Sequence, residues 1–441
     1  MDKIKVIVSC PIDTYSGYGA RSRDIVKALV KTGKYDVQLL SQRWGGTRFG
    51  YLHDHNEMEL KSLIIPAMTS QPDVWIQITV PNEFQPVGKY NIGITAGIET
   101  TICDPSWIEG LNRMNLNLVS SEHAKQVFQQ SKFQIEDNGQ VRGTIELTKP
   151  VEVLFEGVDL ETYLKVPSDS NLDINKHLDS IQESFCFLFV GHWLQGDFGQ
   201  DRKNVGYMVK AFLEVFKNKK NAPALILKTQ GATSSILDRD TIMKKLHDIR
   251  KTVKGTLPNV YIIHGEMSDQ EINQLYNHNK VKAMVSFTKG EGFGRPLLEF
   301  STVNKPIIAS GWSGHIDFLD KEFCYLVNGT LTNVHPSAAV EKMILKESQW
   351  FTPNDSESGN ALKYVYDNYK KYTELAKRQG YKSRNNFSWD KMVERLDEIL
   401  SANLPTFAEE VALSLPSLNL PKLQKVGEAP KLNLPKLQKI K

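Results

Sequence analysis

The segment GEGFGRPLLEF, residues 290–300, places a glutamate on each side of a glycine-rich turn. Glu291 stands before the turn and Glu299 after it, with seven residues between them. Because proline is well tolerated in the first turn of a helix, Arg295-Pro296 predicts a helix start. Glu291 is then expected in the loop before that helix, and Glu299 about one turn inside it. The two carboxylates would contact different points along one ligand rather than form a close acid–base pair.

The ligand expected at this corner carries a phosphate group. Glycines allow backbone N–H groups to approach an oxyanion closely, and the N-terminus of a helix adds a partial positive charge. A surface turn followed by an amphipathic helix would show the same local pattern. The segment therefore has to be judged together with the elements that position it.

Those elements alternate along the first part of the chain. Short apolar runs rich in β-branched residues are separated by segments of helical periodicity. The expected strands lie at residues 4–10, 36–41, 73–79, 90–95, 116–121 and 150–155, and the expected helices at 23–33, 107–114 and 122–131. Strands that alternate with helices predict a parallel sheet covered on both faces.

A polar segment, residues 169–184, separates this part from a second series of the same kind. Its expected strands lie at 186–191, 224–230, 259–265, 282–288 and 306–310, with helices at 204–217, 241–251, 269–278 and 296–303. The fold class expected is therefore α/β, with two doubly wound domains in tandem. Because ligands bind at the carboxyl ends of strands in open α/β sheets, we expect a central cleft between two such edges.

The domain limits expected are 1–166 and 167–384, followed by a closing helix at 385–402 and a tail at 403–441. In the tail LNLPKLQK occurs twice, at 418–425 and 432–439, and between 418 and 441 the lysines outnumber the single acidic residue, Glu428. Four prolines exclude a continuous helix: Pro416, Pro421, Pro430 and Pro435. Two interpretations stay open, a flexible disordered extension or an extended strip that docks on a partner or an anionic surface such as a membrane.

The composition limits the partners and the compartment. The net charge of +3 over 441 residues is too small to indicate nucleic-acid binding by itself. Four scattered cysteines without a CxxC pair suggest neither a zinc site nor disulfides, so a reducing cytoplasm is expected, that of the host if a virus encodes the chain. No apolar run is long enough for a signal peptide or a membrane span.

Several stretches, taken in order, resemble the retaining glycosyltransferases of family 4, which have two Rossmann-like domains of the GT-B type. GEGFGRPLLEF is similar to the family's two-glutamate signature, and SGYGARS to its first glycine-rich loop. GIETT, PVEVLFEGVD, FLFVGHW with DRKN, NVYIIHGE and PIIASGWSGH stand in the order that the family shows. The resemblance spans residues 6–400.

The resemblance implies roles for the residues of the signature. Glu291 would bind the hydroxyls of the donor sugar, assisted by backbone groups of Gly292, Phe293 and Gly294. Glu299 would bind the ribose of the nucleotide. The implied donor is a nucleotide-diphosphate sugar, which serves as a co-substrate.

The resemblance also implies where the rest of the donor lies. Arg202 and Lys203 would neutralise the diphosphate, offering a guanidinium fork and a point charge as the leaving group becomes more negative. Gly17 and Gly19 would lie over the same phosphates, and the base would lie near Gly265. No DxD pattern stands at a strand end in the expected place, so neither a metal nor another cofactor is expected.

Glu99, in GIETT, is the candidate catalytic residue on the acceptor side, with a structural acid as the alternative. In the mechanism proposed for the family, the departing phosphate oxygen helps to take the proton of the acceptor. The new bond forms on the same face of the sugar, and the protein supplies position and charge. No protein nucleophile is then needed.

Three features depart from the family pattern. Gly191-His192 stands where a glycine-arginine pair is usual, which leaves the phosphate to Arg202 and Lys203. Glu156 replaces the asparagine of a common turn, and residues 134–148 form an extra segment. His123, at an expected helix start, is predicted to be exposed.

The function expected is transfer of a hexosyl or pentosyl group to a hydroxyl acceptor with retention of configuration. The acceptor stays open between a glycan, a lipid-linked intermediate, a small molecule, a protein and a hydroxylated DNA base. Only the lysine-rich tail favours nucleic acid. The alternative is a non-catalytic module of the same fold that binds sugar nucleotides or glycans.

Overall fold

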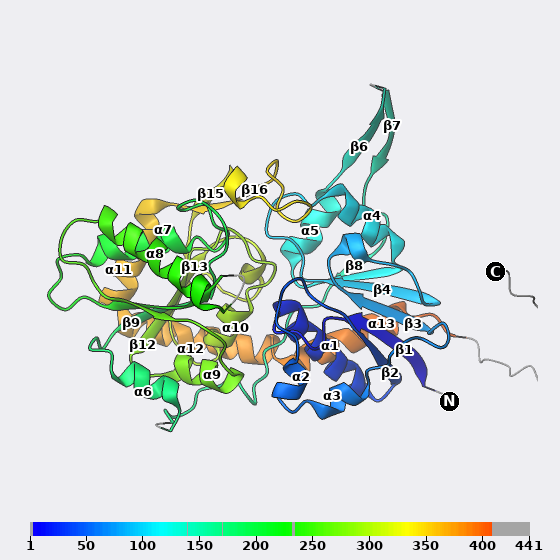
Figure 1. Ribbon diagram of the computed structural model, residues 1–441, viewed down its shortest axis with the longest axis horizontal. Helices are drawn as coiled ribbons and strands as arrows, with labels where there is room; N and C mark the ends of the chain where they lie inside the picture. Colours follow the sequence, from blue (N-terminus) through cyan, green and yellow to red (C-terminus); the bar gives the residue numbers. More distant parts are fainter. Residues whose placement is uncertain (1–2, 139, 170, 232–233, 408–441) are drawn as a thin grey trace, which may run out of the picture. The chain divides into compact units, whose positions relative to one another are not determined.

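The computed structural model describes residues 3–138, 140–169, 171–231 and 234–407. Residues 1–405 form one compact unit, which contains two six-stranded sheets (Figure 1). The predicted tail, 403–441, lies almost wholly outside the described residues, so both interpretations of it stay predictions.

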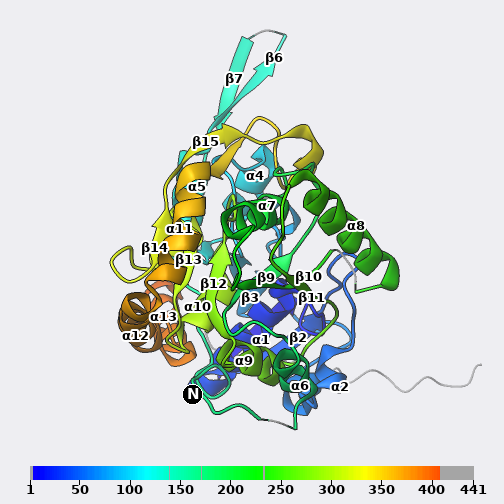
Figure 2. The ribbon, with the colours of Figure 1, turned by 90° about the vertical axis from the view of Figure 1, so that its left-hand side faces the viewer.

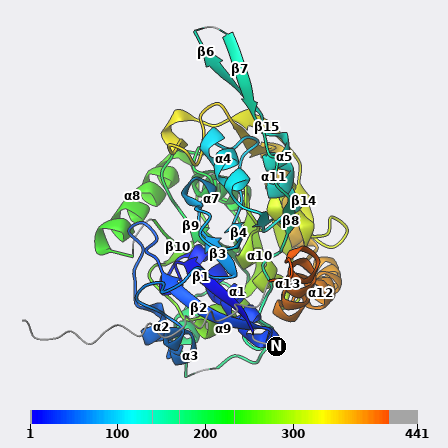
Figure 3. The same cartoon turned by 90° about the vertical axis from the view of Figure 1, so that its right-hand side faces the viewer.

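The first sheet has the strand order β2-β1-β3-β4-β5-β8, and all its pairs are parallel (Figure 3). The strands are β1 (Ile4–Cys10), β2 (Tyr35–Ser41), β3 (Val74–Ile78), β4 (Tyr90–Thr95), β5 (Leu116–Val119) and β8 (Val151–Val153). Between them lie α1 (Gly17–Thr32), α2 (Tyr51–Asp54), α3 (Met58–Ser62), α4 (Pro105–Arg113) and α5 (Glu122–Gln130). The expected parallel sheet of the first half is confirmed.

The second sheet has the order β11-β10-β9-β12-β13-β14 and is also parallel (Figure 2). Its strands are β9 (Cys186–His192), β10 (Ala224–Gln230), β11 (Val260–Ile263), β12 (Val281–Ser286), β13 (Ile307–Ser310) and β14 (Tyr325–Val327). The helices of this half include α6 (Asp173–Asp179), α7 (Val205–Phe216), α8 (Ile236–Thr252), α9 (Asp269–Asn277) and α10 (Arg295–Ser301). The expected second doubly wound unit is confirmed.

The central strand β9 shows why both faces of the second sheet are covered. Its side chains alternate between the two faces, as in any strand. Phe187 and Phe189 pack in the core with Phe212 of α7, whereas Leu188 packs on the opposite face with Leu298 of α10. A strand buried on both faces reads as a continuous apolar run, which is what made it recognisable.

Three helices end the compact unit: α11 (Asp355–Asp367), α12 (Tyr369–Asn386) and α13 (Trp389–Asn403). The last of them returns to the first half of the chain and lies along α1. Lys31 and Lys34 of α1 form ion pairs of 2.6 Å with Asp390 and Asp397 of α13. The chain thus crosses between its halves at the end, while the exact domain limits stay a prediction.

Two hairpins interrupt the alternation. The extra segment of residues 134–148 contains most of an antiparallel pair, β6 (Phe133–Asp137) and β7 (Gln140–Ile145), which stands away from the sheets in Figure 1. A second pair, β15 (Gly329–Asn333) and β16 (Gln349–Pro353), follows β14. No helix within the described ranges is long and apolar enough to cross a bilayer. All four cysteines are buried and unpaired.

Candidate active site

Two loops of the second sheet meet at the point where its strand order reverses. The chain runs from β9 outward to β10 and β11, whereas β12 pairs with the other edge of β9. Loops that follow such neighbouring strands diverge and leave room for a ligand at the carboxyl edge. The loop after β9 carries Arg202 and Lys203, and the loop after β12 carries Glu291. The fold therefore joins Lys203 to Glu291 across 88 residues of sequence.

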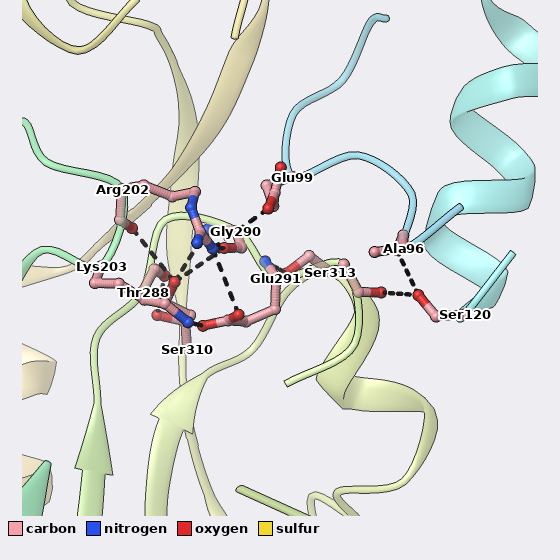
Figure 4. Close-up of polar contacts among 11 residues, drawn as sticks. Ala96, Glu99, Ser120, Arg202, Lys203, Thr288, Gly290, Glu291, Ser310 and Ser313 are labelled. Atoms are coloured by element: carbon pink, nitrogen blue, oxygen red, sulfur yellow. Dashed lines mark hydrogen bonds and ion pairs between the residues drawn. The ribbon is translucent and has the colours of Figure 1, made fainter. Parts of the chain in front are cut away.

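Glu291 lies at the centre of this cluster (Figure 4). Its side chain is buried, with 6% of the residue exposed. Lys203 Nζ donates a hydrogen bond of 2.5 Å to Glu291 Oε1, and Arg202 Nη1 lies 3.5 Å from Oε2. Burial opposes ionisation of Glu291, but the two cations outweigh burial and lower its pKa to about 2. The carboxylate is therefore ionised at any physiological pH.

The backbone of the turn is held by the loop after β13. The Glu291 N–H donates to Ser313 Oγ at 2.9 Å, and the Gly314 N–H donates to the Glu291 carbonyl at 3.0 Å. Ser313 has φ 76° and ψ −163°, a backbone region that is essentially restricted to glycine. Such a strained residue persists only where its surroundings fix it, so the turn and its neighbouring loop form a rigid pair.

Glu99 approaches the cluster from the first half of the chain. It lies in the loop after β4, and its Oε1 is 3.5 Å from Arg202 Nη1 (Figure 4). Arg202 Nη1 also donates to the Gly290 carbonyl at 3.1 Å. Burial disfavours the charged guanidinium, but Glu99 and Glu291 together raise the pKa of Arg202. Two cations and two carboxylates thus neutralise one another between the two sheets.

The glycines of the turn permit a close approach between the halves. A Cβ atom on Gly290 would lie 1.9 Å from the Glu99 carbonyl oxygen, and one on Gly292 would lie 2.5 Å from that of Ala96. Ser120 Oγ lies 3.1 Å from the Gly292 carbonyl oxygen. The sequence indicated an oxyanion as the reason for these glycines, which stays a prediction, and the structure adds the close packing of the loop after β4 as a second reason.

Phe293 and Gly294 have different structural roles from Gly292. The ring of Phe293 is buried in the core beside Phe318, with ring centroids 5.0 Å apart, so only its backbone belongs to the turn. Gly294 has φ 98° and is the cap residue before α10, which begins at Arg295 as predicted. Whether these backbone groups bind a sugar stays a prediction.

Glu299 lies inside α10 and is as buried as Glu291, again with 6% exposed. Its Oε1 accepts a 3.0 Å hydrogen bond from Arg295 Nε, and its Oε2 accepts one of 3.2 Å from the Tyr276 hydroxyl. Burial raises the pKa of Glu299 to about 7; Asp269 adds to this shift, and Arg295 opposes it. Glu299 therefore titrates near neutral pH, unlike Glu291.

Arg295 also connects this end of the site to the first half. Its Nη1 lies 2.5 Å from Asp24 Oδ2 in α1, and both side chains are largely covered. Neither Asp24 nor Tyr276 was selected from the sequence. The four-residue spacing of Arg295 and Glu299 was the available signal, because such pairs face each other on a helix. No local pattern indicates a contact between residues as distant as Asp24 and Arg295.

The remaining predicted glycines lie at the carboxyl ends of other strands. Gly17 is the first residue of α1 and is exposed, with open space where a Cβ would lie. Gly19 is buried in the first turn, where a Cβ would lie 2.3 Å from the Thr14 carbonyl oxygen. Gly265, after β11, has φ 109°, and its carbonyl accepts a 2.7 Å hydrogen bond from Lys228 Nζ. Their proposed contacts with a donor stay predictions.

The two histidines noted in the sequence, His192 and His123, lie near the site. His192 ends β9, and burial lowers its pKa; its Nδ1 lies 3.0 Å from the Gly231 carbonyl oxygen. His123 was predicted to be exposed, and this is wrong. Its ring packs edge-on against Trp312 at 4.6 Å, and burial lowers its pKa to about 4. The prediction failed because the loop after β13, far away in sequence, covers the start of α5.

Neither the models of known families nor the sequences of curated proteins match this chain. Solved structures do match it. HepE of Anabaena, solved with UDP and glucose, has 15% identity and a TM-score of 0.60, covering 90% of this chain and 100% of its own. A glycosyltransferase of Rickettsia africae has 13% identity and a TM-score of 0.61, covering 92% of this chain and 99% of its own.

Sucrose-phosphate synthase of Thermosynechococcus elongatus gives a similar result, with 11% identity, a TM-score of 0.58 and coverage of 91% and 99%. The likeness extends over nearly the whole length of each protein. At such low sequence identity, the likeness to these solved structures establishes the fold alone. The two doubly wound sheets and the returning C-terminal helix are therefore those of a GT-B fold.

Proposed function

We propose that this protein is a retaining glycosyltransferase that transfers a sugar from a nucleotide-diphosphate sugar to a hydroxyl group. The observation that carries the proposal is the cluster at the reversal point of the second sheet. There a buried, ionised Glu291 lies between Arg202 and Lys203 and faces Glu99 of the first half. HepE, which has the same fold, was solved with UDP-glucose, so a UDP-hexose is the first donor to test.

The charges of the cluster define what the donor must do on binding. Arg202 and Lys203 carry two positive charges, and Glu291 and Glu99 carry two negative ones. The diphosphate draws the cations away from the carboxylates, and the sugar hydroxyls replace them as donors to Glu291. Donor binding is thus an exchange of partners within a site where unpaired charge is costly.

The same groups stabilise the reaction as charge moves. The bond between the anomeric carbon and the β-phosphate oxygen breaks, and its electron pair goes to that oxygen, where Arg202 and Lys203 stabilise the growing charge. The acceptor hydroxyl forms the new bond on the same face of the sugar, and its proton passes to the departing phosphate oxygen. Glu99 positions the acceptor from the opposite side.

Glu299 serves the nucleotide end of the donor. Its carboxylate is held by Arg295 and Tyr276 within α10, and each of its oxygens has a lone pair left for a further hydrogen bond. We assign the ribose hydroxyls to Glu299, the base to the turn at Gly265 and the phosphates to the start of α1 at Gly17 and Gly19. No described cluster of three or more His, Cys, Asp or Glu side chains could hold a metal ion, and we propose that transfer needs none.

Thermal unfolding with a panel of nucleotide sugars tests the proposal. A ligand that binds only the folded state raises the apparent melting temperature with the logarithm of its concentration. At least one donor should stabilise the wild type, with EDTA making no difference, and should release free sugar slowly or transfer it to an acceptor. Stabilisation without turnover by any donor would favour the non-catalytic module. No stabilisation by any donor would refute both.

The acceptor is tested separately with the active donor. Candidate acceptors are a glycan, a lipid-linked sugar, a small molecule, a protein and DNA with hydroxylated bases. If DNA is the acceptor, its affinity must fall steeply as salt increases, because phosphate contacts release counterions. Absence of DNA binding at low salt would remove that class.

A further inference from the structure

A second concave site lies on α12, separate from the cluster around Glu291. The site has a volume of about 500 Å³. Its polar lining comes from one stripe of α12, and a phenylalanine of the turn before β14 completes it; the lining includes Phe323, Lys377, Arg378, Tyr381, Lys382 and Asn385. Figure 2 and Figure 3 show α12 beside α13, at the margin of both views.

The opposite stripe of α12 fixes the helix to the fold. Its buried residues include Gln379, Gly380 and Ser383. Ser383 Oγ lies 2.7 Å from Ser301 Oγ at the end of α10, and a Cβ on Gly380 would lie 2.1 Å from Asn304 Oδ1. The stripe that lines the site therefore stands on a rigid support, and the helix separates it from the donor cluster.

The lining contains three cations and no carboxylate. Lys377 pairs with Glu374 at 2.7 Å and Lys382 with Asp320 at 3.2 Å, both outside the lining. Among the described residues, Arg378 has no ion-pair partner, and its side chain is exposed. The polar groups of the site are mainly donors, since ammonium, guanidinium and phenol groups offer N–H and O–H. The wall between these groups is mainly apolar, so a ligand that fits the site combines a negative charge with an apolar or ring-shaped part.

The aromatic side chains add a second requirement. Tyr381 is 68% exposed, a large fraction for a ring that borders a concavity, and Phe323 lies in the same wall. Aromatic rings with polar tips suit ligands that combine an apolar face with polar groups. The volume is that of a small-molecule site rather than a long groove for a polymer.

We propose that this site binds a phosphate monoester or diester attached to a saccharide-sized group. Arg378 gives the forked contact to the phosphate oxygens, Lys377 and Lys382 give point charges, and Tyr381 covers the attached group. The same chemistry occurs in a soluble sugar phosphate and in the headgroup of an anionic phospholipid. Ligands at this site do not compete with the nucleotide sugar.

Two binding experiments separate these sources. In the first, glucose 6-phosphate and neutral glucose are titrated into the full chain by calorimetry. In the second, the chain is sedimented with phosphatidylcholine vesicles that contain or lack phosphatidylglycerol. Binding that needs the phosphate in the first experiment indicates a soluble ligand, and binding that needs the anionic lipid in the second indicates a membrane.

Variants locate the binding. Arg378→Glu reverses the charge of the unpaired guanidinium and should weaken whichever binding is seen by about tenfold or more. Lys363→Glu, on the exposed face of α11, makes the same change in net charge outside the site and should have little effect. Arg202→Ala controls for phosphate binding at the donor cluster and should leave this binding unchanged.

The proposal fails in any of three cases: the wild type binds neither probe, Arg378→Glu binds as well as Lys363→Glu, or only Arg202→Ala loses binding. Circular dichroism and the melting temperature of Arg378→Glu show that loss of binding is not loss of fold. Because the readouts are binding to probes without a nucleotide, they are independent of whether the chain transfers a sugar.

Discussion

The two ends of one short segment, Glu291 and Glu299, behave oppositely although both are 6% exposed. The pKa of Glu291 is lowered to about 2, and that of Glu299 is raised to about 7. Glu291 contacts two cations, Lys203, which it does not share, and Arg202, which it shares with Glu99. Glu299 has one cation, Arg295, which it shares with Asp24. The number of unshared cations, rather than burial, decides which carboxylate stays ionised.

This difference suits the two ends of a nucleotide sugar. A carboxylate beside the anomeric carbon benefits from a permanent negative charge, because an oxocarbenium-like transition state is positive. A carboxylate that only accepts hydrogen bonds from a ribose needs no permanent charge. The comparison therefore predicts chemistry at one end and affinity at the other.

Removing a cation from Glu291 should have the largest effect. Lys203→Met leaves a buried carboxylate with one partner, so we expect a loss of about 3–5 kcal/mol of folding free energy and a fall in transfer rate of about 10²–10³-fold. Urea unfolding measures the loss of folding free energy, and initial rates measure the fall in transfer. The double variant Lys203→Met/Glu291→Gln should recover much of the stability but none of the activity. If the double variant is less stable than the single one, the pairing is not what holds Glu291.

The pH dependence of stability should separate the two glutamates. The folded pKa of Glu299 exceeds its ordinary value of 4.5, so its stabilising contribution is complete below pH 4.5 and is lost as the pH rises through about 7. This contribution of Glu299 to the free energy of unfolding amounts to roughly 3 kcal/mol. For Glu291 the sign is reversed: its contribution is present above pH 4.5 and is lost as the pH falls toward 2.

Unfolding by urea from pH 4 to 8 measures this difference. Between pH 4.5 and 7, Glu299→Gln should flatten the decline of stability relative to the wild type. Glu291→Gln should leave the slope in that range unchanged. Equal slopes for the wild type and Glu299→Gln would mean that Glu299 is ionised throughout.

Enzyme kinetics should distinguish the roles of Glu291 and Glu299 in the same way. Glu291→Gln should lower kcat by about a hundredfold, because it removes a charge felt mainly in the transition state, and should raise KM for the donor only by the share of affinity that the sugar contributes. Glu299→Gln should raise KM by about tenfold and change kcat little. Initial rates over a range of donor concentrations measure both. The reverse pattern would exchange the assigned ends of the donor.

A single methyl group added at Gly290 should disturb the close contact between the two halves of the chain. Gly290→Ala places a Cβ on the Glu99 carbonyl and should cost about 1–3 kcal/mol of stability and reduce transfer. Gly17→Ala is the matched control, because its Cβ would have open space at the start of a helix. Thermal unfolding of both compares them. Equal melting temperatures would show that the close packing at Gly290 relaxes without cost.

The sequence was sufficient for what depends on local pattern. The apolar runs predicted every strand of the two sheets except β14, and Arg295-Pro296 predicted the start of α10. The reversal point of the second sheet then brings Arg202 and Lys203 to Glu291 without further information. The contacts that join the halves could not be found in this way. Asp24 with Arg295 and Ser120 with Gly292 lie 271 and 172 residues apart, and no periodicity connects them.

The structure shows a second reason for the turn glycines, and the predicted approach of their N–H groups to an oxyanion stays a prediction. A glycine can be needed because its backbone lets an N–H group approach an oxyanion, or because another loop packs so closely that there is no space for a Cβ. A single sequence does not distinguish these reasons. The extra segment of residues 134–148 was noted as an insertion, but its form as the β6–β7 hairpin depends on pairing that begins before it, at Phe133 and Ile145.

Calorimetric titration of the best nucleotide sugar, and of its nucleoside diphosphate alone, into the wild type and Glu291→Gln tests the central claim most directly. Glu291 binds the sugar, so the variant should keep its affinity for the nucleoside diphosphate and lose the additional affinity that the sugar provides. If the variant binds the complete donor as tightly as the wild type does, Glu291 does not contact the sugar and the proposed site is wrong.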